Sequence, residues 1–171
     1  MDAYLAVVSK REVRDYAPRP LTPDAERRIL EAVRIAGSSK NRQARRFVVV
    51  RDAGIREEVA SSVYAGDNVR GAALVVAVVV GGKGPTAFDA GRAAQNMMLA
   101  ASNDAVGSCP NGIADAERLR AALAHGEDEQ VTTVMTFGYP AKARRDPASL
   151  SADEWIERAD RRPWEEIVEE L

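Results

Sequence analysis

The hydrophobic pattern predicts alternating helices and strands around one long helix rich in small residues. An apolar stripe at helical spacing begins after Phe88 and consists of Ala90, Ala93, Ala94, Met97, Met98, Ala101 and Ala105. We expect Asp89 to cap the start of this helix and Gly107 to end it. Because small side chains let a neighbouring helix approach closely, the stripe predicts a central helix that is packed on two sides.

The same reading predicts shorter elements before and after the central helix. Helices are expected at 2–9, 22–36, 55–64, 115–124, 151–158 and 165–171, and strands at 47–51, 74–80 and 131–137. Residues 74–80 are apolar at both odd and even positions, which is typical of a central strand buried on both faces. Residues 65–71 and 107–112 are expected to be loops, the second rich in small residues that allow backbone to lie against a flat ligand.

The segment after the last predicted strand contains several apolar side chains whose exposure to water is unfavourable. They are Trp155, Ile156, Trp164, Ile167, Val168 and Leu171. Such a tail either wraps its own domain or embraces a partner subunit. Together with the small-residue helix, it favours an intertwined homodimer. We therefore expect one domain over residues 1–171, in which residues 140–171 form an extension around the partner.

Composition narrows the class of protein. The chain has 171 residues and a formal net charge of −2, which disfavours a general nucleic-acid or membrane-surface role. One cysteine and one histidine make a zinc site of the usual kind very unfavourable, and the lone cysteine fits a reducing, cytoplasmic compartment. No apolar run is long enough to span a bilayer, and His125, in an acidic polar segment, is expected at the surface.

Two polar segments are candidates for binding chemistry. Residues 10–14 read Lys-Arg-Glu-Val-Arg, a cationic cluster that becomes a phosphate site only if another segment closes over it. Residues 38–46 read Ser-Ser-Lys-Asn-Arg-Gln-Ala-Arg-Arg. That segment is an exposed loop, a loop that binds phosphate and amide groups, or a small nucleic-acid patch. The acidic overall balance and the lack of interleaved aromatic residues disfavour the last of these.

Four separated segments together resemble the FMN-dependent nitroreductase family, in its small branch with a short insertion. KREVRDY at 10–16 resembles RRSVRxF, and GSSKNRQARRFVVV at 37–50 resembles PSSxNxQPWxFVVV. DAGRAAQNMMLAASNDAVGSC at 89–109 resembles DxGxAAxNLxLAAxxxGLGSC. GYP at 138–140, followed by RRPWEEIV at 161–168, resembles the family's closing GYP…RKPLEEVV. The four segments cover almost the whole chain.

The resemblance implies an α+β fold with a mixed β-sheet flanked by helices. It also implies an intertwined homodimer with two FMN sites at the subunit interface, and a C-terminal tail that crosses to the partner. The implied cofactor-binding residues are Lys10, Arg11, Glu12, Arg14, Ser38, Ser39, Asn41, Gln43, Asn68, Ser108, Cys109, Pro110, Gly112, Arg161 and Arg162. The cations among them match phosphate-binding positions, residues 38–43 match the loop from the second subunit, and residues 108–112 match the segment against the flavin ring.

Three departures from the family pattern bear on the predicted site. Glu12 replaces a serine, Ala44 and Arg45 replace Pro-Trp, and the connector at 81–86 is short. The implied activity is NAD(P)H-dependent reduction of a small-molecule acceptor, a nitroaromatic or a quinone, by ping-pong hydride transfer. No acid–base side chain is needed for it, so we assign no catalytic residue and no metal. Cys109 would serve for fit and not as a nucleophile.

Other functions remain open at this point. One is a flavin-binding storage or sensor protein without reductase turnover. Another is a flavin-free dimer that binds anions or nucleic acid through Lys40, Arg42, Arg45 and Arg46. A third is a related enzyme that fragments flavin or removes halogens, for which the short connector offers no covering insertion. The sequence does not distinguish NADH from NADPH or identify the electron acceptor.

Overall fold

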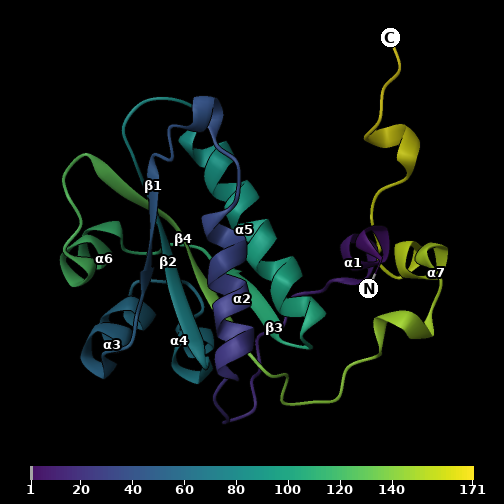
Figure 1. The fold of residues 1–171 in the computed structure, drawn as a ribbon, viewed down its shortest axis with the longest axis horizontal. Helices are drawn as coiled ribbons and strands as arrows, with labels where there is room; N and C mark the ends of the chain where they lie inside the picture. The colour runs from purple at the N-terminus through teal and green to yellow at the C-terminus, as the bar shows by residue number, and fades with distance from the viewer. Residues whose placement is uncertain (1) are drawn as a thin grey trace. The chain divides into compact units, whose positions relative to one another are not determined.

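The computed structural model describes residues Asp2–Leu171, which form two compact units. The larger unit is Arg11–Ala143, and the smaller one combines the N-terminal residues up to Lys10 with Arg144–Leu171. Figure 1 shows the elements of both units. Within the described residues, no helix has both the length and the apolar character needed to cross a membrane.

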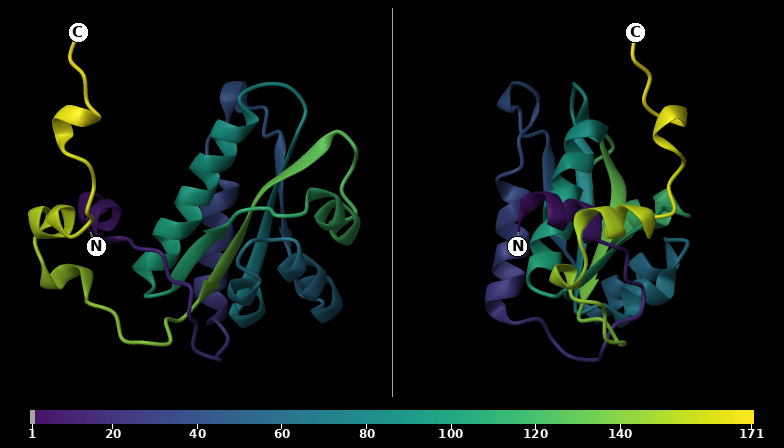
Figure 2. Two further views of the ribbon diagram at one scale, coloured as in Figure 1. Left: turned by 180° about the vertical axis from the view of Figure 1, so that it is seen from behind. Right: turned by 90° about the vertical axis from the view of Figure 1, so that its right-hand side faces the viewer.

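The larger unit is built on a four-stranded antiparallel sheet in the order β1-β2-β4-β3. Its strands are β1 (Arg45–Val49), β2 (Leu74–Gly81), β3 (Gly107–Asn111) and β4 (Glu129–Gly138). Its helices are α2 (Pro23–Arg34), the 3₁₀ turn η1 (Ser39–Asn41), α3 (Ala53–Ser61), α4 (Gly66–Gly71), α5 (Thr86–Asn103) and α6 (Ala116–Leu123). Helices α2 and α5 lie side by side on one face, and α3, α4 and α6 lie on the other (Figures 1 and 2).

Strand β2 carries the core on both faces, as its uniformly apolar sequence predicts. Leu74, Val76 and Val78 are buried under α2 and α5, whereas Val75 and Ala77 are buried in the cluster that contains α3 and α6. The alanine and methionine stripe of α5 from Ala90 to Ala101 is buried as predicted, while Ala105 lies beyond the helix and is exposed.

Several local predictions are wrong. Asp89 does not cap α5, because the helix begins at Thr86 and the Asp89 carboxylate instead accepts a hydrogen bond from the backbone N–H of Ser39 (2.9 Å). Helix α5 ends at Asn103, and the chain turns through Ala105 at φ 56°, so Gly107 begins a strand instead of ending the helix.

The predicted loop at 107–112 is largely strand β3, and the predicted loop at 65–71 contains α4. The implied mixed sheet is also corrected: every strand pair within Asp2–Leu171 is antiparallel. The α+β class itself is confirmed.

The smaller unit contains α1 (Ala3–Ser9), the 3₁₀ turns η2 (Pro147–Ser149) and η3 (Trp164–Glu166), and α7 (Ala152–Glu157). Asp2 caps α1, and Ser151 and Glu154 form a capping box at α7. Trp155 is buried, and its indole N–H donates to the Pro147 carbonyl (3.0 Å). The helix predicted at 165–171 is wrong, since only the η3 turn forms there.

Candidate functional site

A pair of glycines brings the first predicted site segment against the sheet. Gly107 on β3 pairs with Gly138 on β4. A Cβ atom at Gly107 would lie 2.6 Å from Cβ of Val13, and one at Gly138 would lie 2.8 Å from the Tyr16 ring. The missing side chains let the segment Arg11–Tyr16 cross the end of these two strands. The Val13 N–H then donates to the Ser108 carbonyl (3.0 Å), so Arg11, Glu12 and Arg14 lie beside the start of β3.

A chain of buried polar side chains runs beneath this surface. Asn68 on α4 donates through Nδ2 to Oδ1 of Asn111 (2.9 Å). Asn111 donates through its own Nδ2 to the Val134 carbonyl (2.9 Å) and to Oγ1 of Thr136 (3.2 Å). Thr136 Oγ1 lies 2.9 Å from the hydroxyl oxygen of Tyr16. We call Tyr16, Asn68, Asn111 and Thr136 the polar ladder. All four are at most 8% exposed.

The polar ladder is held by backbone carbonyls at its outer contacts. The Tyr16 hydroxyl oxygen lies 2.7 Å from the Val13 carbonyl oxygen, and the Thr136 hydroxyl oxygen lies 3.1 Å from the Cys109 carbonyl oxygen. The two hydroxyl protons are shared among these two contacts and the 2.9 Å contact between the hydroxyls. Burial raises the pKa of Tyr16 above its ordinary value, and the hydrogen bond with Thr136 offsets only part of that rise. Tyr16 therefore stays protonated. The ladder holds β3 in place through the side chain of Asn111 and the carbonyl of Cys109, both of which lie on that strand.

The end of β3 is covered by an exposed aromatic ring. The Tyr64 N–H donates to the Gly112 carbonyl (3.1 Å), and a Cβ at Gly112 would lie 3.2 Å from the Tyr64 ring. The Tyr64 side chain is 82% exposed, and Pro110 and Gly112 are exposed as well. Ser108 and Cys109 are buried, so of this predicted segment only Pro110 and Gly112 present themselves at the surface.

The second predicted segment, residues 38–43, forms a tightly held loop near the start of α5. The Ser38 hydroxyl accepts a hydrogen bond from the Gln43 N–H (2.9 Å), and the Ser39 N–H donates to Asp89. Lys40, Asn41 and Gln43 all have left-handed backbone, with φ between 50° and 52°. Non-glycine residues adopt this conformation at a cost and cluster in functional segments.

Two arginines after this loop are committed to the fold. The Arg45 guanidinium donates to the carbonyls of Gly37 (3.1 Å) and Ala36, just beyond the end of α2, and so closes the base of the 38–43 loop. Arg46 binds both carboxylate oxygens of Glu129, each at 2.8 Å. Of the four cations considered for nucleic acid, only Lys40 and Arg42 are free of such bonds within Asp2–Leu171.

The remaining predicted residues lie in the smaller unit. Lys10 follows α1 and is half-buried, and Arg161 and Arg162 are exposed after α7. The Arg161 guanidinium donates to the Ala159 carbonyl (2.7 Å). Across the described chain no acidic side chain forms an ion pair with Arg14, Arg161 or Arg162, so their charges remain available for a ligand.

Within one chain, the predicted residues of the larger unit form two separate groups. Residues 11–14, Asn68 and 108–112 meet around β3, which follows the C-terminal end of α5. Residues 38–43 lie at the N-terminal end of α5, where Ser39 contacts Asp89. Because α5 has 18 residues, these ends are about 27 Å apart. One chain therefore does not bring both groups to a single small ligand.

The comparison with protein families accounts for this arrangement of segments. The sequence profile of the nitroreductase family matches residues 7–80 and 59–139. The chain belongs to the nitroreductase family. The resemblance that the four motifs indicated is thereby confirmed.

Individual nitroreductase relatives cover nearly the whole chain. A protein of Archaeoglobus fulgidus assigned as NADH dehydrogenase/NAD(P)H nitroreductase is 26% identical over 167 residues, 87% of this chain and 96% of the relative. A structure from Desulfovibrio desulfuricans, assigned as a nitroreductase and solved in complex with FMN, is 28% identical, covers 100% of this chain and 98% of its own, and has a TM-score of 0.83. A nitroreductase family protein from Clostridium difficile 630 covers 99% and 98% at a TM-score of 0.84 and 21% identity, which shows the fold alone.

Sequence reasoning missed four residues of this nitroreductase surface. Tyr16, Asn111 and Thr136 complete the polar ladder, and Tyr64 covers Gly112. Asn111 and Thr136 meet only through the β3–β4 pairing, which places Asn111 opposite Val134 and Cys109 opposite Thr136. Thr136 interrupts the apolar run Val134–Phe137, and a polar group that is buried needs a partner, so this position offered the available signal.

Proposed function

We propose that this chain is an FMN-dependent NAD(P)H oxidoreductase that works as a homodimer. The observation that carries the proposal is the FMN-bound nitroreductase structure that aligns with the chain over its full length. A relative by sequence, from Archaeoglobus fulgidus, bears the corresponding NAD(P)H nitroreductase assignment.

The chain's own residues fit a flat ligand that carries a phosphate. Arg14, Arg161 and Arg162 offer guanidinium groups without carboxylate partners, and guanidinium groups bind phosphate with strong charge-assisted hydrogen bonds. Lys10 and Arg11 belong to the same proposed set. At the other part of the site, the glycine at position 112 makes room for the Tyr64 ring, which would lie 3.2 Å from a Cβ there, and we propose that this exposed ring and the β3 segment together face the flat ring of the ligand.

The position of β3 explains which groups this chain contributes. β3 is the last strand in the order β1-β2-β4-β3, so one of its edges is not used by a neighbouring strand. The Val13 N–H donates to the Ser108 carbonyl on this strand. Pro110 has no N–H to donate. Other backbone N–H groups of this edge would stabilise negative charge on the ring, and the polar ladder would hold them in place.

The proposed chemistry belongs to the cofactor: bound FMN would supply hydride transfer from NADH or NADPH to a second small molecule, in the alternating order that gives ping-pong kinetics. The chain's residues position the ring and keep one face accessible. Asn68 and Cys109 pack inside, and the exposed Tyr64 ring lies where it can contact an acceptor. Nitroaromatics and quinones are the acceptors we propose to test.

A second copy of the chain would complete the site. Residues 38–43 and the β3 surface lie at opposite ends of α5, so the proposed site takes one group from each subunit. The tail also supports this arrangement, since Trp164, Ile167 and Leu171 are more than half exposed. Burying such side chains on a partner would stabilise the dimer by the hydrophobic effect. The crossing tail and the single domain over residues 1–171 remain parts of this proposal.

The first test is the visible absorption spectrum of the purified protein, recorded before and after anaerobic addition of NADH or NADPH. Flavin bands that bleach support the proposal, and bound flavin that stays oxidised favours the storage or sensor alternative. No flavin even after incubation with FMN would refute the cofactor assignment. Steady-state kinetics with a quinone test the ping-pong order, because intersecting double-reciprocal lines would contradict it.

The phosphate assignment has its own test. Arg14→Ala and Arg161→Ala are each expected to weaken FMN binding by roughly tenfold, because each removes a charge-assisted hydrogen bond. Arg27→Ala is the control, since Arg27 is an exposed α2 residue near Asp24 (3.9 Å) with no proposed role. Fluorescence titration of the apoprotein with FMN measures all three. Unchanged affinity in both site variants would show that the phosphate lies elsewhere.

A further inference from the structure

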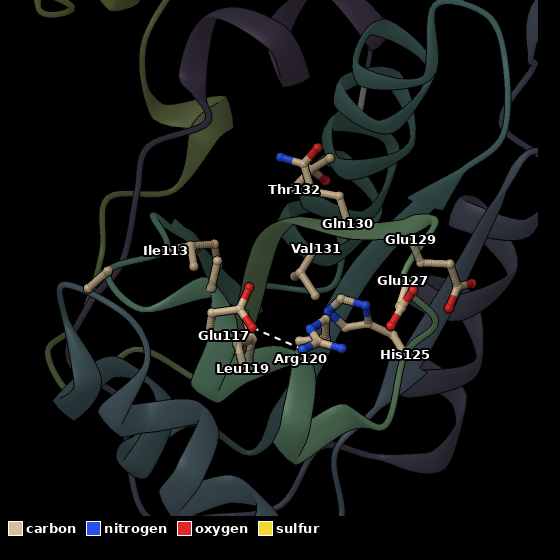
Figure 3. A pocket seen from close by; sticks show the side chains of 12 residues that line it. Ile113, Glu117, Leu119, Arg120, His125, Glu127, Glu129, Gln130, Val131 and Thr132 are labelled. Carbon is tan, nitrogen blue, oxygen red and sulfur yellow. Dashed lines mark hydrogen bonds and ion pairs between the residues drawn. The ribbon is translucent and has the colours of Figure 1, made fainter.

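A cavity of about 600 Å³ lies between α6 and the beginning of β4, within the larger unit (Figure 3). Strand β3 pairs with β4 only over Val134–Gly138, so the earlier part of β4 has no strand neighbour on that side. The chain that leaves β3 at Ile113, together with α6, encloses the space instead. Leu119 and Val131, both buried, give the cavity an apolar wall.

The chain's single histidine lines this cavity. We expected His125 at the surface, and that expectation is wrong, because the side chain is only 9% exposed. Its ring extends from the turn after α6 toward the cavity (Figure 3). Nδ1 lies 3.2 Å from the Gly126 carbonyl oxygen. A carbonyl oxygen only accepts, so this contact favours the tautomer with the proton on Nδ1, in which Nε2 is a hydrogen-bond acceptor.

The charged groups around the cavity leave one carboxylate uncompensated. Glu117 is paired with Arg120 (3.0 Å). Glu129 is held by Arg46 (2.8 Å) and also accepts from the Gly126 N–H (2.9 Å). Glu127 takes part in no ion pair within Asp2–Leu171. Arg46 does not line the cavity, so the lining side chains include three carboxylates and one guanidinium group, and Glu127 is the carboxylate among them without an ion-pair partner in the described residues.

We infer that this cavity binds an organic monocation: a primary ammonium or guanidinium group attached to a short apolar body. The cation donates hydrogen bonds to Glu127 and to Nε2 of His125, and the apolar body packs on Leu119 and Val131. A metal ion is a poor occupant, because among the described residues no group of three metal-ligating side chains comes together. This cavity is separate from the proposed flavin site. The two are adjacent in sequence at one point, where Ile113 of the cavity follows Gly112 of the flavin site.

The single histidine provides a direct reporter of binding. We would follow the His125 ring resonances of the tag-free full-length protein by ¹H–¹³C NMR at a fixed pH of 8. The probes are n-butylammonium, methylammonium and n-butyrate at equal ionic strength. We expect a saturable shift with n-butylammonium, binding at least about threefold weaker with methylammonium because it has less apolar surface, and no saturation with butyrate.

A pair of charge-neutralising variants locates the contact. Glu127→Gln should weaken n-butylammonium binding by roughly five- to tenfold. Asp128→Asn is the matched control, because it removes the same charge one residue away at a side chain that does not line the cavity, and it should leave binding within about twofold. The His125 shifts of each variant without probe verify that the cavity is intact.

Three results would overturn the inference. They are the absence of a saturable shift with n-butylammonium, equal binding of n-butyrate, and equal weakening by Glu127→Gln and Asp128→Asn. The last would mean that the cation responds to the general acidic field of the turn and not to a built site. None of these results depends on FMN or on reductase activity, so the proposed function is tested separately.

Discussion

The polar ladder gives the sharpest stability prediction, through Thr136→Val. Thr136 is fully buried, and its hydroxyl contacts three partners: the Tyr16 hydroxyl, Asn111 Nδ2 and the Cys109 carbonyl. Valine keeps the shape of threonine, so the change removes hydrogen bonds without leaving a cavity.

The size of the effect follows from what each partner retains. Tyr16 keeps the Val13 carbonyl at 2.7 Å, and Asn111 keeps the Val134 carbonyl at 2.9 Å. The Cys109 carbonyl keeps a 3.2 Å bond from Asn111 Nδ2. No group is wholly orphaned, so we expect Thr136→Val to lower the free energy of unfolding by about 1–2 kcal/mol.

A double-mutant cycle with Tyr16→Phe isolates the hydroxyl–hydroxyl contact. Tyr16→Phe should also cost about 1–2 kcal/mol. The double variant should cost less than the two single changes together, by about 0.5–1 kcal/mol, because the shared 2.9 Å contact is lost only once.

Urea unfolding followed by circular dichroism, at one fixed protein concentration, measures each free energy. Thr132→Val is the control, since its hydroxyl makes one 3.2 Å bond to the Val78 carbonyl outside the ladder. A Thr136→Val stability within about 0.3 kcal/mol of the parent, or strict additivity in the cycle, would refute the ladder as a stabilising network.

Three further predictions test other parts of the larger unit. Arg45→Ala should raise amide hydrogen exchange in residues 38–43 by roughly tenfold, because it opens the base of that loop; unchanged exchange would contradict this role. Gly107→Ala should cost about 1–3 kcal/mol, since its Cβ would meet a neighbouring valine at 2.6 Å, whereas Gly71→Ala, with open space around it, should stay within about 0.5 kcal/mol in urea unfolding. The Arg46 hydrogen bonds lower the pKa of Glu129 to about 2, so its stabilising contribution is present above the ordinary value of 4.5 and is lost as pH falls toward 2. Glu129→Gln should therefore flatten the acid side of a stability–pH curve over that range, and an unchanged slope would show that the pair does not contribute.

The sequence predicts the parts of this fold that depend on local pattern. The apolar run at 74–80 and the small-residue stripe of α5 need only periodicity, and the caps at Asp2 and Ser151 need only neighbouring backbone. Asp89 shows the limit of that reasoning. It is a suitable capping residue near a helix start, yet its carboxylate binds the Ser39 N–H, 50 residues away along the chain.

The candidate site is harder to predict because strand pairing creates it. The sequence predicts a loop at residues 107–112, because no local pattern there indicates that β4 pairs with this segment. The same pairing brings Asn111 to Thr136, and the turn after α6 folds His125 inward. Motif order identified most of the proposed residues, but their burial and mutual contacts required the three-dimensional arrangement.

At two positions where the chain departs from the family motifs, the side chain that is present makes hydrogen bonds of its own. Where the motif has Pro-Trp, this chain has Ala44-Arg45, and the arginine secures the 38–43 loop through hydrogen bonds to the end of α2. Where the first motif ends in Phe, the chain has Tyr16, whose hydroxyl contacts the Val13 carbonyl and the Thr136 hydroxyl.

A surface that had lost its function would have no need to keep a loop with three left-handed residues closed, or to satisfy the buried hydroxyls of Tyr16 and of Thr136 on β4. In this chain both segments are held by hydrogen bonds of the replacing side chains. They therefore support a retained ligand site, and the paired Arg45 and Thr136 variants test each half of it independently.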